Sequence, residues 1–431
     1  MGTKRKAATI FSSVILLSFL FQTFSQLHGS LDEGLVDKVQ VGVVLDMASL
    51  EGKIIHSCIS MAISDFYSLH THYKTRLVLH IEDSKGEPLY ALSAAFNLLK
   101  NKKVRGIIGV QTSLEAKLMA ELGNKAKFPV ISFSTPSPSP SFTKYPYFLQ
   151  IMEDDIHQAK GIVAMIEAFK WRDVILIYED TDSVRDIILY FLIFYEKNIR
   201  IAFKNAFSTT SEDDHIIEEL QKLKELQTTV FVVHASHFLV SRICLTAKSL
   251  GMMNEGYVWI MTTRSMNVIH SMDSSVIESM QGVIGFKSYI PPSKKLENFT
   301  KRWRRKIHAQ QLEIEITDLS AYSLWAYDFA WALAKAIEKV NWEIAFTHKP
   351  NKMGLNLIDL YNLTTSKYGS MLTKEILQSR FKGLSGAFQF VDGKLVLNTF
   401  EIVNVIGRGE RRVGYWNAVG KHHKRIILII K

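Results

Sequence analysis

The sequence predicts an α/β protein built from two lobes, each a doubly wound parallel sheet with helices on both faces. The chain has 431 residues, more than one ordinary domain of about 100–200 residues holds. Apolar residues make up 47% of the chain and charged residues 22%, as in soluble globular proteins. Runs typical of buried strands alternate with helical periodicity, and this alternation starts twice.

The first series opens at Val39–Leu45, whose continuous apolar run indicates a strand buried on both faces. A helix is predicted over Lys53–Leu69, where apolar residues recur at helical spacing. The remaining strands and helices follow in alternation: Arg76–Ile81, Pro88–Leu99, Val104–Ile108, Leu114–Lys127 and Pro129–Phe133. The Ser- and Pro-rich segment Ser132–Pro146 then predicts a loop at a lobe boundary.

The second series repeats the pattern. Its predicted helices are Ile156–Phe169, Val184–Tyr195, Ile216–Leu226 and Phe238–Leu250. Its predicted strands are Val174–Tyr178, Ile201–Phe203, Val230–His234 and Tyr257–Met261. Gln281–Pro292 marks a second transition, after which we expect a basic helix around Phe299–Lys306, a long amphipathic helix, Tyr322–Val340, and late strands in Phe381–Val391 and Thr399–Ile406.

The amino terminus indicates export. A basic start, Met1–Lys6, precedes the apolar run Ala7–Phe24, and small residues follow at a cleavage-like spacing. This predicts a signal peptide over residues 1–25, with an uncleaved anchor helix as the alternative. We therefore expect the secretory pathway, and either the extracellular face of the plasma membrane or a secreted protein. In that setting the triplets at Asn298 and Asn362 are candidate glycosylation sites.

Charge and motifs exclude several function classes. The net charge of +10 is concentrated at the two ends, three charges in Met1–Lys6 and six from Arg408 to Lys431, so the middle is nearly neutral and no nucleic-acid partner is expected. No phosphate-binding glycine loop, nucleophile elbow or metal-ligand spacing is present, so we expect no catalytic residues, no metal, no cofactor and no enzyme. Cys58 and Cys244 fall in different series, and no bond between them is expected.

Many segments, in order, resemble the amino-terminal domain of plant glutamate-receptor-like channels. The segments are VGVVLDMASLEGK (41–53), GNKAKFPVISFS (123–134), MIEAFKWRDVILIYED (165–180), AKSLGMMNEGYVWIMT (247–262), IESMQGVIGFKSYIP (277–291), LWAYDFAWALAKAIEK (324–339), FKGLSGAFQFVDGKL (381–395) and IVNVIGRGERRVGYW (402–416). The resemblance covers about residues 38–417.

The resemblance implies a periplasmic-binding-protein-like type I clamshell, whose two lobes are joined by three crossovers. Lobe one would comprise residues 38–148 and 287–390, and lobe two residues 149–286 and 391–417. Residues 418–431 would be a basic tail, a linker truncated before the agonist-binding and pore domains of a full channel.

The resemblance also implies a ligand site. Family members hold an amino acid with hydroxyls and amides after two first-lobe strands, which correspond here to Thr112, Ser113, Ser134 and Thr135. Asp155 matches a position that can face the ligand's amine. The alternative is that these residues cap helices. This chain also departs from the family pattern: Val110 replaces a proline, and Thr263-Arg264 replaces an Asp-Gly pair.

The implied function is an extracellular ligand-binding or assembly domain of a plant glutamate-receptor-like, ligand-gated cation channel. Its expected partners are a small molecule such as an amino acid and other receptor-like channel subunits. Membrane association would come through those partners or through an uncleaved signal segment. The alternative is a secreted, non-binding receptor remnant or regulatory subunit with a degenerate cleft.

Overall fold

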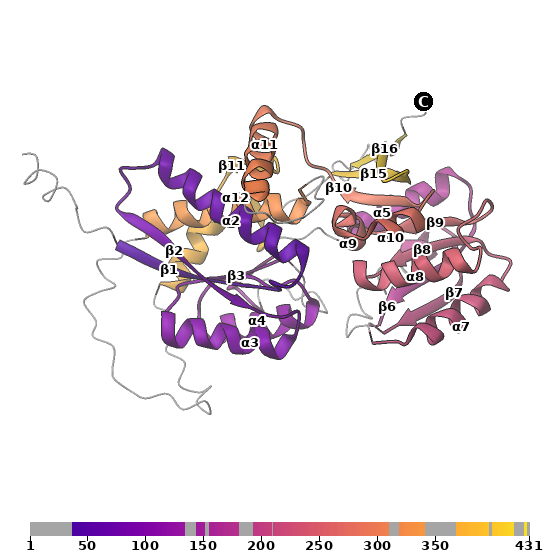
Figure 1. Cartoon of the computed structure of the whole chain (residues 1–431), viewed down its shortest axis with the longest axis horizontal. Helices are drawn as coiled ribbons and strands as arrows, with labels where there is room; N and C mark the ends of the chain where they lie inside the picture. The colour runs from indigo at the N-terminus through magenta and orange to yellow at the C-terminus, as the bar shows by residue number, and fades with distance from the viewer. Residues whose placement is uncertain are drawn as a thin grey trace, which may run out of the picture.

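A computed structural model describes residues 37–133, 144–150, 155–180, 193–208, 210–309, 319–340, 368–395, 399–417 and 426–428. In this part of the chain two sheets form two lobes that lie side by side (Figure 1). The predicted signal peptide lies outside the described residues, as does most of the predicted tail. The predicted helix Val184–Tyr195 also falls largely outside them.

The sheet of the first lobe has the strand order β13-β14-β5-β4-β3-β1-β2. Its strands are β1 (Asp37–Leu45), β2 (Thr75–Asp83), β3 (Ile107–Gly109), β4 (Val130–Ser132), β5 (Phe148–Gln150), β13 (Phe390–Val391) and β14 (Lys394–Leu395). The pairs from β2 to β14 are parallel, and β13 adds an antiparallel edge. A small separate hairpin joins β11 (Phe381–Lys382) to β12 (Ala387–Phe388).

Helices cover both faces of this sheet, because successive side chains of a strand point to opposite faces. Along β1, Val41 and Val43 join a core with α2 and α12, whereas Val44 joins the core under α3 and α4. The helices of the lobe are α2 (Leu50–Leu69), α3 (Pro88–Asn97) with the π-helical turn η1 (Leu98–Lys102), α4 (Ser113–Ala126), α11 (Lys294–Ala309), α12 (Ala321–Lys339) and α14 (Gly369–Leu377).

The sheet of the second lobe has the order β17-β16-β15-β10-β9-β8-β6-β7. Its strands are β6 (Asp173–Glu179), β7 (Arg200–Phe207), β8 (Val230–His234), β9 (Val258–Met261), β10 (Ile284–Ser288), β15 (Thr399–Ile406), β16 (Gly409–Asn417) and β17 (Ile426–Leu428). The run from β7 to β10 is parallel, and β15, β16 and β17 continue it with antiparallel pairs.

This second sheet is also covered on both faces. Ile175 and Ile177 of β6 pack into one core, and Val174 and Leu176 pack into the other. The helices of the lobe are α5 (Asp155–Ala168), α7 (Asp213–Lys224), α8 (His237–Ser249), α9 (Thr263–Met266), the 3-10 turn η2 (Ile269–Ser271) and α10 (Ser274–Ser279). The predicted doubly wound α/β class is therefore confirmed, with mixed rather than wholly parallel sheets.

The chain passes between the sheets three times: after β5, after β10 and after β14. The expected cuts at 148/149, 286/287 and 390/391 each fall inside a strand, namely β5, β10 and β13. Strand pairing fixes these segments to one sheet, since Lys394 of β14 pairs with Gln150 of β5. We therefore propose lobe boundaries after Gln150, Ser288 and Leu395.

Two other expectations needed correction. The late strand expected over Phe381–Val391 is broken into β11, β12 and β13, because the turn between β11 and β12 is tied to a buried carboxylate of α12, that of Asp328. Part of the expected tail, Ile426–Leu428, is a strand that pairs with β16. Cys58 and Cys244 are both free and buried, and they lie in the cores of different lobes.

Candidate functional site

The polar groups that follow the parallel strands are the candidate site, because ligands of open α/β sheets bind beyond the carboxyl ends of the strands. In the first lobe these groups follow β1 and β3. In the second lobe they follow β6, β8 and β9 and include the start of α5.

The loop after β3 has an unusual backbone. Gly109 has a φ of +145°, and a Cβ atom there would lie 1.8 Å from the Val44 carbonyl oxygen, so only glycine fits. Val110 has a φ of 61°, which is rare for a β-branched residue, and its N–H donates to the Val44 carbonyl at 2.9 Å. Proline cannot adopt that φ, and it has no N–H to donate in that hydrogen bond. The backbone at Val110, where the family pattern has a proline, is thus one that proline cannot form.

The first turn of α4 is closed by its own residues. The Thr112 hydroxyl accepts from the Glu115 N–H at 3.3 Å and donates to Glu115 Oε2 at 3.0 Å. Glu115 Oε2 also accepts from the N–H groups of Thr112, at 2.9 Å, and Gln111, at 3.0 Å. This is a capping box, in which Thr112 caps α4. A carboxylate of the protein itself therefore occupies part of the helix start, which otherwise attracts anions.

Glu115 is fully buried, and its other oxygen, Oε1, has no hydrogen-bond partner among the described residues. Next to it, Gln111 joins the loops after β1 and β3, because its Oε1 accepts from the Asp46 N–H at 3.0 Å. The Asp46 carboxylate in turn accepts from the N–H groups of Ala48 and Ser49 at the start of α2. The first-lobe loops thus form one hydrogen-bonded unit.

In the second lobe a buried carboxylate connects two strand ends. Glu179, the last residue of β6, accepts from the Ser236 N–H at 2.7 Å and from the Ser236 hydroxyl at 3.2 Å, directly after β8. The Arg264 guanidinium lies 3.5 Å from the same carboxylate, and its side chain is 20% exposed. An isolated arginine at this position would repel the ammonium group of a ligand. Its charge is balanced by Glu179, so the repulsion is smaller than an isolated arginine would produce.

Gln158 ties α5 to the loop after β9. Its Oε1 accepts from the Thr263 N–H at 2.9 Å, and its Nε2 donates to the Thr263 hydroxyl at 2.8 Å, with both residues buried. His234 ends β8 nearby; burial, and next the charge of Arg264, lower its pKa from 6.5 to about 3. His234 is therefore neutral at physiological pH, and Arg264 is the positive group at this edge.

The predicted site residues are distributed over both lobes. Thr112 is exposed at the start of α4, and Ser113 beside it is almost fully buried. Asp155 is the first residue of α5. Ser134 and Thr135 lie outside the described residues, and so does Asn362. Asn298 is exposed on α11. Ligand contact by the first five of these residues and glycosylation of the two asparagines stay predictions.

Several residues of the site were not predicted from the sequence, among them Glu115, Gln158 and Glu179. Glu115 was detectable, since a threonine three residues before a glutamate is the capping-box signature. Gln158 and Glu179 gave no signal, because their partners lie 105 and 57 residues away along the chain.

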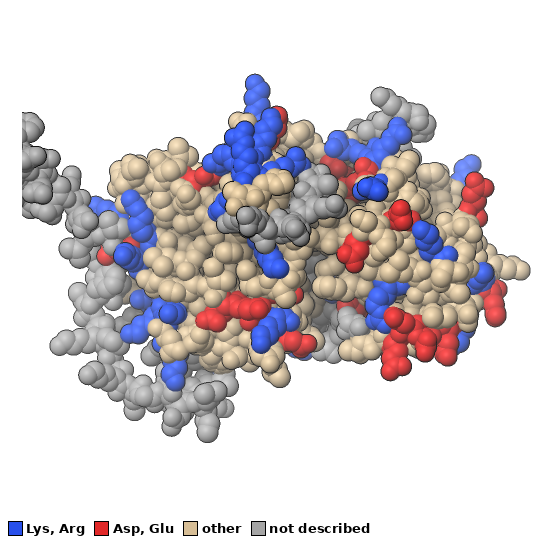
Figure 2. Space-filling model, in the orientation of Figure 1, with Lys and Arg blue, Asp and Glu red and all other residues tan. Residues whose placement is uncertain are grey.

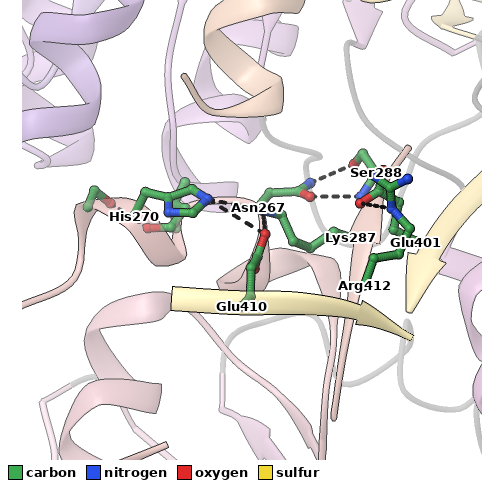
Figure 3. A network of polar contacts seen from close by, with 9 residues as sticks. Asn267, His270, Lys287, Ser288, Glu401, Glu410 and Arg412 are labelled. Carbon is green, nitrogen blue, oxygen red and sulfur yellow. Dashed lines mark hydrogen bonds and ion pairs between the residues drawn. The ribbon is translucent and has the colours of Figure 1, made fainter. Parts of the chain in front are cut away.

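A second polar network lies where β10 ends and the chain leaves the second lobe (Figure 3). Ser288 exchanges two hydrogen bonds with buried Asn267, at 2.8 and 2.9 Å. Next to it Lys287 pairs with Glu410 of β16, and His270 Nε2 lies 3.6 Å from the same carboxylate. Burial raises the pKa of Glu410. The hydrogen bonds and positive charges of His270 and Lys287 lower it by a larger amount, so the net shift of the pKa is downward. This network anchors the second crossover.

Two features are absent from the described residues. No group of three or more His, Cys, Asp or Glu side chains is placed to hold a metal ion there. Among the same residues, no helix combines the length and the apolar character that crossing a membrane requires.

Comparison with known proteins places this fold in a family. The model of the receptor family ligand binding region matches residues 55–408. Three relatives from Arabidopsis thaliana are similar. Glutamate receptor 1.2 is 45% identical, and the match covers 96% of this chain and 45% of the relative. Glutamate receptor 2.2 is 39% identical over 88% of this chain and 40% of the relative, and glutamate receptor 1.1 is 38% identical over 97% of this chain and 49% of the relative. The chain thus spans less than half the length of each. It belongs to the family of receptor ligand-binding regions, with the type I periplasmic-binding-protein-like fold, and is a plant glutamate-receptor-like amino-terminal domain.

Proposed function

We propose that this ligand-binding region acts outside the cell and closes its two lobes around a small zwitterionic molecule such as an amino acid. The supporting observation is that polar groups follow the parallel strands of both lobes, with the charges of Arg264 and Glu179 balanced against each other. An amino acid carries one positive and one negative group, and strand ends that carry both carboxylates and an arginine suit it better than they suit a simple ion.

In this proposal the ligand carboxylate meets the loop of Thr112 and Ser113, together with Ser134 and Thr135. The ammonium group meets Asp155 from the second lobe. Binding would shift the population from open to closed lobes, because the closed state alone contacts the ligand from both sides. No catalytic step is assigned.

Thermal-shift measurements and calorimetry with the twenty amino acids and glutathione test this proposal. A ligand present at about 100 times its Kd should stabilise the protein by about 2.7 kcal/mol. Asp155→Asn should weaken binding, since it removes the charge opposite the amine, whereas Glu225→Gln, which removes an exposed carboxylate at the C-terminal end of α7, serves as the matched control. If no ligand stabilises the protein at millimolar concentration, binding of this class is refuted.

The full relatives are glutamate receptors, and we propose that the chain works with such proteins as an assembly domain of a ligand-gated cation channel. Association with other receptor-like subunits, or an uncleaved signal segment, would bring it to the membrane. Co-purification of the chain with a full-length relative tests this role, and a failure of the two proteins to associate at micromolar concentration would refute it.

A secreted, non-binding form is the second candidate, and one observation favours it. Glu115 already occupies part of the start of α4 and accepts from Gln111 and Thr112. A ligand carboxylate would have to approach this buried carboxylate. The ligand screen decides between the two candidates.

A further inference from the structure

One helix of the first lobe carries far more charge than its surroundings. α11 contains seven Lys or Arg residues and a single acidic residue, Glu297. Figure 2 shows Lys and Arg gathered over this helix, which projects from the first lobe in Figure 1. The net charge summed over the middle of the chain is close to zero, so it does not reveal the positive charge gathered on this one helix.

The helix has two opposite faces. Phe299, Trp303 and Ile307 are buried in the first-lobe core, and the Trp303 indole N–H donates to the Ser57 hydroxyl at 2.7 Å. At 100° per residue the opposite face is basic and exposed. We call this set the α11 basic face: Lys294, Lys295, Lys301, Arg302 and Arg305.

The charges of this face are only partly compensated. Lys301 pairs with Glu297 at 2.6 Å, and Arg302 pairs with Asp65 of α2 at 2.9 Å. Neither Lys294 nor Arg305 forms an ion pair with a described residue. Like charges four residues apart, such as Lys301 and Arg305, destabilise a helix by about 0.2–0.5 kcal/mol per pair. Folding alone therefore gives no reason for so many cations here, whereas an anionic ligand would.

We propose that the α11 basic face binds a linear acidic polysaccharide. The face runs along the exposed side of one 16-residue helix, so it suits a polymer lying along that helix. No large apolar side chain of α11 is exposed, whereas a protein interface needs an apolar or aromatic core. A carboxylate on successive sugars would meet successive cations of the face. This inference does not depend on a ligand between the lobes.

Asn298 lies at the centre of the α11 basic face, since Lys294 and Arg302 flank it at four residues on either side. A glycan on Asn298 would cover the face. Both the secreted full chain and its Asn298→Gln variant are therefore needed in the test, and the variant is expected to bind at least as tightly.

The test measures binding to polygalacturonate by biolayer interferometry, with neutral dextran as the uncharged comparison. The test variant removes three charges from the face: Lys294→Gln, Lys301→Gln and Arg305→Gln. The matched control removes three exposed charges elsewhere on the first lobe: Lys102→Gln, Lys117→Gln and Lys125→Gln.

The test variant should lose about tenfold or more in affinity and show a shallower dependence on salt, because fewer counterions are released on binding. The control should change less than about twofold, since its charges lie on another surface. The proposal is overturned if neither the full chain nor Asn298→Gln binds polygalacturonate, if dextran binds equally well, or if the two triple variants lose equal affinity. It is also overturned if the test variant abolishes self-association, measured by sedimentation, and leaves polysaccharide binding unchanged.

Discussion

Replacing Glu51 by glutamine should make the first lobe more stable at neutral pH. Glu51 lies in the first turn of α2, is 7% exposed and accepts a hydrogen bond from the Ser320 hydroxyl. Burial, offset in part by that hydrogen bond, raises the pKa of Glu51 from 4.5 to about 7. The folded protein thus keeps this carboxyl protonated in a pH range in which the unfolded chain has released the proton.

The size of the effect follows from the difference between the two pKa values, at about 1.4 kcal/mol per unit. The raised pKa of Glu51 contributes stability that is fully present below pH 4.5 and lost as pH rises to about 7. The loss is about 3 kcal/mol at most. Glu51→Gln cannot ionise and keeps an oxygen for Ser320, so it should lack this loss and exceed the native protein by up to that amount at pH 8.

Hydrogen exchange of the amides in α2 and α12 between pH 4.5 and 8 measures this effect in the lobe concerned, after correction for intrinsic exchange rates. Glu297→Gln, which removes an exposed carboxylate from α11, is the matched control and should change stability by less than about 0.5 kcal/mol. Parallel profiles for Glu51→Gln and the native protein would show that burial does not raise the pKa of Glu51 and would contradict this prediction.

Three further substitutions test local features. Val110→Pro should destabilise the protein by about 3 kcal/mol or more in chemical denaturation, because the φ of 61° and the N–H bond to Val44 are both lost; a neutral outcome would show that the loop has another conformation. Asp328→Ala should cost about 2–5 kcal/mol in the same assay, since the buried carboxylate accepts from the N–H groups of Leu384 and Ser385, at 2.7 and 2.8 Å. Unchanged stability would contradict that role. Because the pKa of Glu410 is lowered, its contribution to folding stability should be present above pH 4.5 and lost as pH falls further. The melting temperature of Glu410→Gln should therefore lie below that of the native protein at pH 7 and approach it in acid. A difference in melting temperature that does not change with pH would count against the network.

The sequence was sufficient for the long elements of the fold and insufficient for its short edges. The strand predicted over Val230–His234 matches β8, because a run of five buried residues carries its own signal. β5 and β14 have three and two residues, too few to show any periodicity. β16 was missed because an edge region such as GERRV carries charge instead of an apolar run.

The candidate site divides in the same way. The capping box at Thr112 is local, so the sequence could have shown it completely. The contact of Arg264 with Glu179 joins residues 85 positions apart, and its effect on charge becomes visible only in the fold. The α11 basic face shows a related limit, because averaging charge over the whole middle of the chain removes a local concentration on one helix.

Each lobe supplies a buried carboxylate to its own strand ends, and this affects which ligands the site suits. The Glu115 carboxylate accepts hydrogen bonds from N–H groups at the start of α4, and the Glu179 carboxylate forms an ion pair with Arg264. The groups that attract anions are therefore partly satisfied before any ligand arrives. A ligand charge that meets the start of α4 or Arg264 gains less than it would from an unpaired group, because it competes with an internal contact. Contacts that form only when the lobes close, including the proposed one with Asp155, should therefore determine affinity more than the charges at these two positions.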